Sequence, residues 1–147
     1  MSSEANVVKD LLDRGLRPIQ ADMDRFAAGL RATNTASDRP PASAFKALHA
    51  ARDHALAAQK ALLAVSHIYL IPGGAQAVRT FKYLADGLSA VDRGLASTGT
   101  TAAHAFTDAR SLLARSSAEF RKADRVLGCP YGCQQKPIPT TFRIGLQ

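Results

Sequence analysis

Residues 42–71 form the longest stretch of the chain without glycine or proline, and Pro72, Gly73 and Gly74 end it. Alanine, leucine, lysine and glutamine supply most of this stretch, and all four are strong helix formers. Thirty residues of α-helix span roughly 45 Å, so a helix that buries its apolar face must run beside it for a similar distance. We therefore expect one long helix over 42–71 that sets the size of the fold.

Three other segments repeat apolar residues at steps of three and four, the spacing of a single helix face. These segments run from Val8 to Leu30, from Val78 to Leu95 and from Ala102 to Leu127. Gly15 and Pro18 lie inside the first segment, and a proline removes one backbone donor from a helix. Because the apolar spacing continues across both residues, one kinked helix is favoured over two short helices.

Polar and turn-forming residues separate the four segments. Residues 33–41 have no periodic apolar residue and predict a connection, and residues 97–101 predict a turn, with a continuous helix as the alternative. Gly128 follows the last segment, where a left-handed helix cap is common. Helices of similar length with short connections predict an all-α, antiparallel up-down four-helix bundle over 1–128.

The remaining residues, 129–147, differ from the bundle in character. The sequence Cys129-Pro130-Tyr131-Gly132-Cys133 predicts a turn, and 140–144 alternates enough for a short extended segment. We expect an extended tail that either folds along the bundle or contacts a partner.

The composition favours a soluble, cytoplasmic protein of one domain. The net charge of +7 permits nucleic acid or acidic partners but also simply maintains solubility. The polar residues 1–6 do not form a secretory signal, and the apolar run 61–71 is too short to span a bilayer, so no membrane partner is expected. The excess of arginine over lysine is typical of GC-rich bacterial or phage genomes.

The sequence offers few groups for catalysis. A di-iron bundle needs glutamates on all four helices, and the chain has only Glu4 and Glu119. Nucleophile-elbow, phosphate-loop and metalloprotease motifs are missing from the sequence. We therefore expect a protein that is not an enzyme and needs no cofactor.

Two histidines, His49 and His67, are candidate site residues. His49 and Asp53 share a helix face, most simply as a surface pair. His67 lies beside Ser66 and Tyr69 in an apolar run, which favours a buried core or interface histidine. The alternative is a ligand pocket between helices formed by Ser66, His67 and Tyr69.

Cys129 and Cys133 have three possible states. They can be free thiols, as is usual in a reducing compartment, or an intramolecular disulfide. They can also supply half of a zinc site, but its other ligands would have to come from helix histidines or a second subunit.

Basic residues gather on one flank of the last helical segment. Cations near a helix C-terminus offset its dipole, which explains part of the excess. Contact with phosphate or an acidic partner is the alternative interpretation. The flank consists of Arg110, Arg115, Arg121, Lys122 and Arg125.

These observations favour a non-enzymatic helical interaction or structural module, a homo-oligomer or a component docked on a protein partner. Alanine-rich helix faces suit close packing against a second copy. The alternatives are a nucleic-acid-associated regulator that uses the basic flank and a small-ligand sensor with a pocket in the bundle core.

Overall fold

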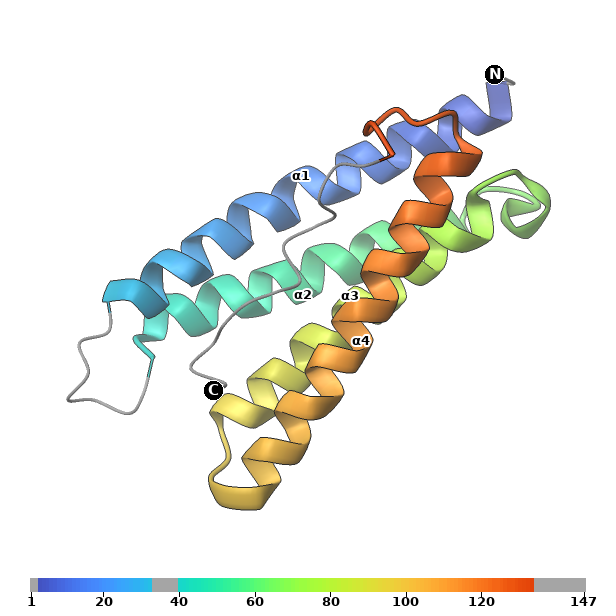
Figure 1. The fold of residues 1–147 in the computed structure, drawn as a ribbon. Coiled ribbons are helices and arrows are strands. Elements are labelled where there is room, and N and C mark those ends of the chain that lie inside the picture. The colour runs from blue at the N-terminus through green and yellow to red at the C-terminus, as the bar shows by residue number, and fades with distance from the viewer. Residues whose placement is uncertain (1–2, 33–39, 134–147) are drawn as a thin grey trace.

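A computed structural model describes residues 3–32 and 40–133 (Figure 1). Within these ranges the chain forms four α-helices and one 3-10 helix, and no strand. They are α1 (Ser3–Ala32), α2 (Ala42–Leu63), η1 (Ile68–Leu70), α3 (Gly74–Leu95) and α4 (Gly99–Val126). The prediction of an all-α helical bundle is confirmed, whereas the expected extended segment at 140–144 lies outside the described residues.

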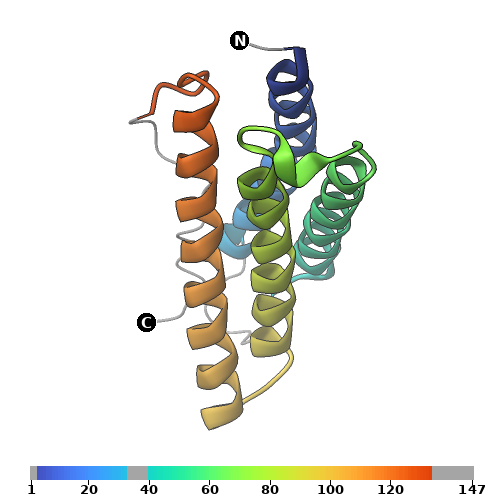
Figure 2. The ribbon, with the colours of Figure 1, turned by 90° about the vertical axis from the view of Figure 1, so that its right-hand side faces the viewer.

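The helices pack mainly in the order of the chain. α1 and α2 form one antiparallel pair, α3 and α4 form another, and α2 and α3 join the two pairs. The α3–α4 pair is inclined to the α1–α2 pair (Figure 1), and α2 lies at one edge of the helices (Figure 2). The start of α1, the α2–α3 connection and the end of α4 all lie at the same end of the bundle.

Small residues bring α1 and α2 close together. A Cβ added at Gly29 would lie 2.9 Å from the Cβ of Ala44, and one at Gly15 would lie 2.7 Å from the Cβ of Ala58. The contact near the end of α1 is with the start of α2, and the contact earlier in α1 is with a later part of α2, as in antiparallel helices. Side chains larger than hydrogen at Gly15 and Gly29 would therefore force the two helices apart.

A similar close approach joins α3 and α4. A Cβ at Gly87 would lie 2.8 Å from Cδ2 of Leu113, so this glycine leaves room for a core leucine. Leu62, Leu88 and Leu113, one from each of three helices, are all buried. The apolar spacing of the sequence therefore predicted the shared core of these helices correctly.

The first helix and the connection between α3 and α4 agree with the predictions made from the sequence. α1 is a single helix with Pro18 inside it, as favoured over two short helices. α3 ends at Leu95 and α4 begins at Gly99, which confirms separate helices and excludes the continuous alternative.

The expected helix over 42–71 is wrong at its C-terminal end. α2 ends at Leu63, and the chain then turns through His67, whose φ of 58° is left-handed, before the short η1 helix. An L-residue with this φ cannot continue an α-helix. Pro72 and Gly73 therefore lie at the end of the α2–α3 connection and do not terminate α2.

The buried face of α2 consists mainly of alanine. Its buried residues are Ala44, Ala47, Leu48, Ala51, Ala55, Ala58 and Leu62. Leu56 and Leu63 of α2 are instead 47% and 45% exposed. The alanine-rich face is thus used inside the bundle, and a different face of α2 remains open.

Candidate functional site

The end of α4 is fixed by a glycine in the left-handed region. Gly128 has a φ of 86°, and its N–H donates to the carbonyl of Arg125 at 3.2 Å. The N–H of Cys129 donates to the carbonyl of Asp124 at 2.8 Å. This pair of bonds is the Schellman arrangement, and it confirms the predicted cap at Gly128.

The buried carboxylate of Asp124 holds the loop that follows. Its Oδ1 accepts the N–H of Tyr131 and its Oδ2 accepts the N–H of Cys133, each at 2.8 Å. Hydrogen bonds to an ionised acceptor are stronger than neutral ones. Asp124 therefore satisfies two backbone donors of residues 129–133, which we call the disulfide loop.

Cys129 and Cys133 are joined by a disulfide with a Cα–Cα separation of 5.0 Å. Both cysteines have a positive φ, 62° and 55°, which L-residues adopt only at some cost. This is one of the three states left open by the sequence. Among the residues that the structure describes, no three His, Cys, Asp or Glu side chains gather as a metal site.

Tyr131 connects the disulfide loop to the opposite end of the chain. Its ring packs on Phe120 with a centroid distance of 5.1 Å, and its hydroxyl donates to Oδ1 of Asp13 on α1 at 3.4 Å. Asp13 also pairs with Arg17 at 2.7 Å. The disulfide loop thus ties the end of α4 to the first half of α1.

The environment of Tyr131 favours the neutral phenol. Burial raises the pKa of its hydroxyl well above the ordinary value, and the negative charge of Asp13 raises it further. Tyr131 therefore acts as a hydrogen-bond donor to Asp13 over the whole physiological pH range.

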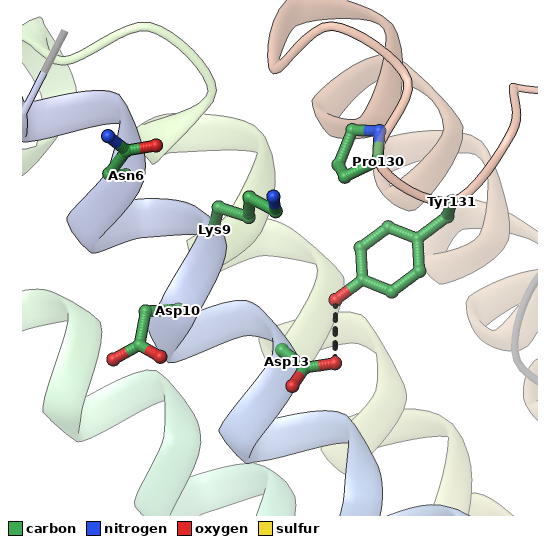
Figure 3. Close-up of a pocket in the computed structure, with 6 residues that line it drawn as sticks. All are labelled: Asn6, Lys9, Asp10, Asp13, Pro130 and Tyr131. Atoms are coloured by element: carbon green, nitrogen blue, oxygen red, sulfur yellow. Dashed lines mark hydrogen bonds between the residues drawn. The ribbon is translucent and has the colours of Figure 1, made fainter. Parts of the chain in front are cut away.

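A cavity of about 390 Å³ lies between α1 and the disulfide loop (Figure 3). In Figure 3 the hydroxyl of Tyr131 points toward Asp13, while the Lys9 side chain extends toward the loop. Asp10 pairs with Arg14 at 3.0 Å, so both carboxylates of the cavity already have a basic neighbour. The lining residues are Asn6, Lys9, Asp10, Asp13, Pro130 and Tyr131.

Two polar pairs between helices were not predicted from the sequence. The buried carboxylate of Asp22 on α1 contacts Nδ1 of His54 on α2 at 2.5 Å and also pairs with Arg25. His49 on α2 contacts Asp92 on α3 at 2.9 Å, not Asp53 as expected. Both partners lie on other helices, so only the helix register could reveal these pairs.

The five residues of the basic flank are all exposed on α4. Lys122 lies 3.6 Å from Glu119, and Arg110 donates to the hydroxyl of Thr107 at 3.3 Å. The guanidinium of Arg115 lies 5.9 Å from the ring centre of Tyr83 on α3, and the ammonium of Lys82 lies 5.6 Å from it. Arg110, Arg115 and Lys122 of the flank therefore already have contacts within the chain.

Ser66, His67 and Tyr69 are exposed residues of the α2–α3 connection. The interpretation of His67 as a buried core histidine is therefore wrong. The structure also places the proposed ligand pocket of these three residues outside the bundle core, because their side chains are not enclosed between helices.

Large apolar side chains are exposed in α2 and in the connection after it. Leu70 is 81% exposed and Tyr69 is 60% exposed, and the exposed Leu56 and Leu63 precede them on α2. Large exposed apolar patches mark contact sites on proteins, whereas single exposed apolar residues are common on any surface. We call Asp53, Leu56, Ala57, Lys60 and Leu63 of α2, together with Ala64 just after its last residue, the α2 outer stripe; all six are exposed.

Comparisons of the chain with protein-family models, with curated proteins and with solved structures find no match. None of the described helices is both long and apolar enough to cross a membrane. The cytoplasmic location stays a prediction, and the disulfide is a bond more typical of oxidising compartments.

Proposed function

We propose that this chain is a non-enzymatic helical interaction module that self-associates or docks into a larger assembly. The observation that carries the proposal is the exposure of Leu70 and Tyr69 together with Leu56 and Leu63. Fully burying one exposed leucine side chain contributes about 1.5–3 kcal/mol, so these three leucines, together with Tyr69, are a substantial source of affinity.

The internal contacts of the bundle support the same proposal. The carboxylates around the disulfide loop are engaged in structural bonds, because Asp124 binds two loop N–H groups and Asp13 binds Arg17 and Tyr131. The loop thus stabilises the fold, whereas α2 and the connection after it offer exposed apolar side chains for contact.

A double substitution of surface leucines tests the proposal. In the full chain, Leu63→Ser with Leu70→Ser should weaken association at least tenfold, because two exposed leucines are removed from the contact. The measurement is sedimentation of the purified chain, alone and with proteins that co-purify with it. The matched control is Val7→Ser, which changes an exposed apolar residue on α1.

The α-helical circular dichroism of both variants should equal that of the original chain, because none of these side chains is buried. Association that is equally strong in the original chain and the double variant would refute the proposal.

The basic flank supports a second candidate, a nucleic-acid-associated regulator. Arg121 and Arg125 are exposed in the last turns of α4, and Tyr83 on α3 provides an aromatic ring near Lys82 and Arg115. Aromatic rings among cations suit single-stranded nucleic acid. Binding that weakens with salt and is lost in Arg121→Glu with Arg125→Glu would support this role, and unchanged mobility of DNA and RNA would exclude it.

A further inference from the structure

We propose that the α2 outer stripe is the interface of a homodimer in which two copies of α2 pack antiparallel across a two-fold axis between Leu56 and Ala57. The inference rests on the proposed interaction function and names its partner as a second copy of this chain. It is carried by the pattern of charge and side-chain size along the stripe.

The stripe follows one side of α2. Its residues recur at steps of three and four, which keeps them on one helix face. This face lies opposite the buried alanines that pack α2 within the bundle. Because α2 lies at one edge of the helices (Figure 2), a second helix can approach this face without meeting α1 or α3.

Charge favours one register for two copies of the stripe over those that oppose like charges. In a two-fold interface, a contact from residue i to residue j is repeated from j to i. When Leu56 faces the partner's Ala57, Asp53 faces the partner's Lys60, and symmetry makes this pair twice. With the two-fold axis at Asp53, the two copies of Asp53 would face each other, and with the axis at Lys60, the two copies of Lys60 would do so. In a parallel arrangement both of these like-charge pairs would form.

Side-chain size fits the same register. Leu56 faces an alanine of the partner, and Leu63 falls opposite the partner's Ala50, a half-buried alanine beside the stripe, so each leucine meets a small side chain. This alternation lets two helices interdigitate at the short end of the usual 8–10 Å separation. Asp53 keeps 67% of its side chain exposed despite its contact with Arg52 at 3.3 Å. It therefore remains accessible to a second copy.

Reversal of the two charges provides the test. We expect the full-length chain to sediment as a dimer, and Asp53→Lys or Lys60→Asp alone to raise its dissociation constant about tenfold by creating two like-charge pairs. The double variant, Asp53→Lys with Lys60→Asp, should recover the dimer because both pairs again have opposite signs. The control is Asp86→Lys, an exposed aspartate on α3, which should leave the dissociation constant unchanged.

Each other result overturns a stated part of the inference. A monomer at the highest soluble concentration excludes the homodimer, although the interaction function survives where Leu63→Ser with Leu70→Ser abolishes binding to another protein. A dimer that is insensitive to either single charge change, or that the double variant does not restore, excludes this register. A dimer weakened as much by Asp86→Lys reflects net charge and likewise refutes the proposed pairing.

Discussion

Reduction of the Cys129–Cys133 disulfide should lower the free energy of unfolding by about 2 kcal/mol. The bond closes a loop of only five residues, since the two cysteines are four positions apart. The chain-entropy relation for a loop of this length gives about 2 kcal/mol at 25 °C. In a domain of this size, that loss corresponds to a decrease in melting temperature of about 4–8 °C.

Two features of the loop modify this value in opposite directions. Relaxation of Cys129 and Cys133 out of the left-handed region would recover part of the loss, because such a conformation costs of order 1 kcal/mol per residue. Loss of the Tyr131 contacts with Phe120 and Asp13 would add to it. The first effect lowers the cost of reduction, and the second raises it.

The assay is urea denaturation followed by far-ultraviolet circular dichroism, with and without a dithiol reductant. The matched variant, Cys129→Ser with Cys133→Ser, should have the stability of the reduced chain and should not respond to the reductant. Thiol titration of the denatured chain reports how many cysteines are paired in each sample.

Two results would refute the reasoning. One is an unchanged urea midpoint after titration has shown that the reductant freed both thiols, because the bond would then contribute nothing to stability. The other is two free thiols in the chain purified without reductant, because the disulfide would then be absent under the conditions that preserve the fold.

Two further predictions concern α1 and Tyr131. Gly15→Ala should lower the free energy of unfolding by about 1–3 kcal/mol in chemical denaturation, although alanine is the better helix former, because its Cβ would lie 2.6 Å from the ring of Phe81; equal or greater stability would contradict this packing. The raised pKa of Tyr131 means that the folded chain keeps a proton that the unfolded chain releases near pH 10, so this contribution to stability is complete below about pH 10 and declines above it. Tyr131→Phe should remove that part of the alkaline decline in a pH series of thermal melts, and an identical decline in both chains would refute it.

The helices were predictable from the sequence because the spacing of apolar residues in each segment matches the helix face that is buried. Leu12, Ile19, Met23 and Phe26 of α1 are buried at the spacing that the sequence displays. The error at the end of α2 has a local cause, since Ser66 to Leu70 continue an apolar run that is compatible with a helix. Only the folded chain shows that this run turns instead.

The polar contacts of α1 with α2 and with the disulfide loop were less predictable because the two partners of each are distant in sequence. His54 contacts Asp22, and Tyr131 contacts Asp13, across separations of 32 and 118 residues. Neither pair shares an element, so spacing along the chain carries no signal for either. The basic flank was predictable as a set because all its members lie on α4, but the contact of Arg115 with Tyr83 depends on α3.

The sequence alone determined that the chain forms amphipathic helices with glycine and polar residues between them, because helix periodicity and turn chemistry act over a few residues. Tertiary structure decided which face of α2 is buried. Alanines opposite Gly15 and Gly29 allow α1 to approach closely, so the small side chains enter the bundle and Leu56 and Leu63 remain outside. That choice depends on the fit between two helix surfaces, and neither surface specifies it by itself.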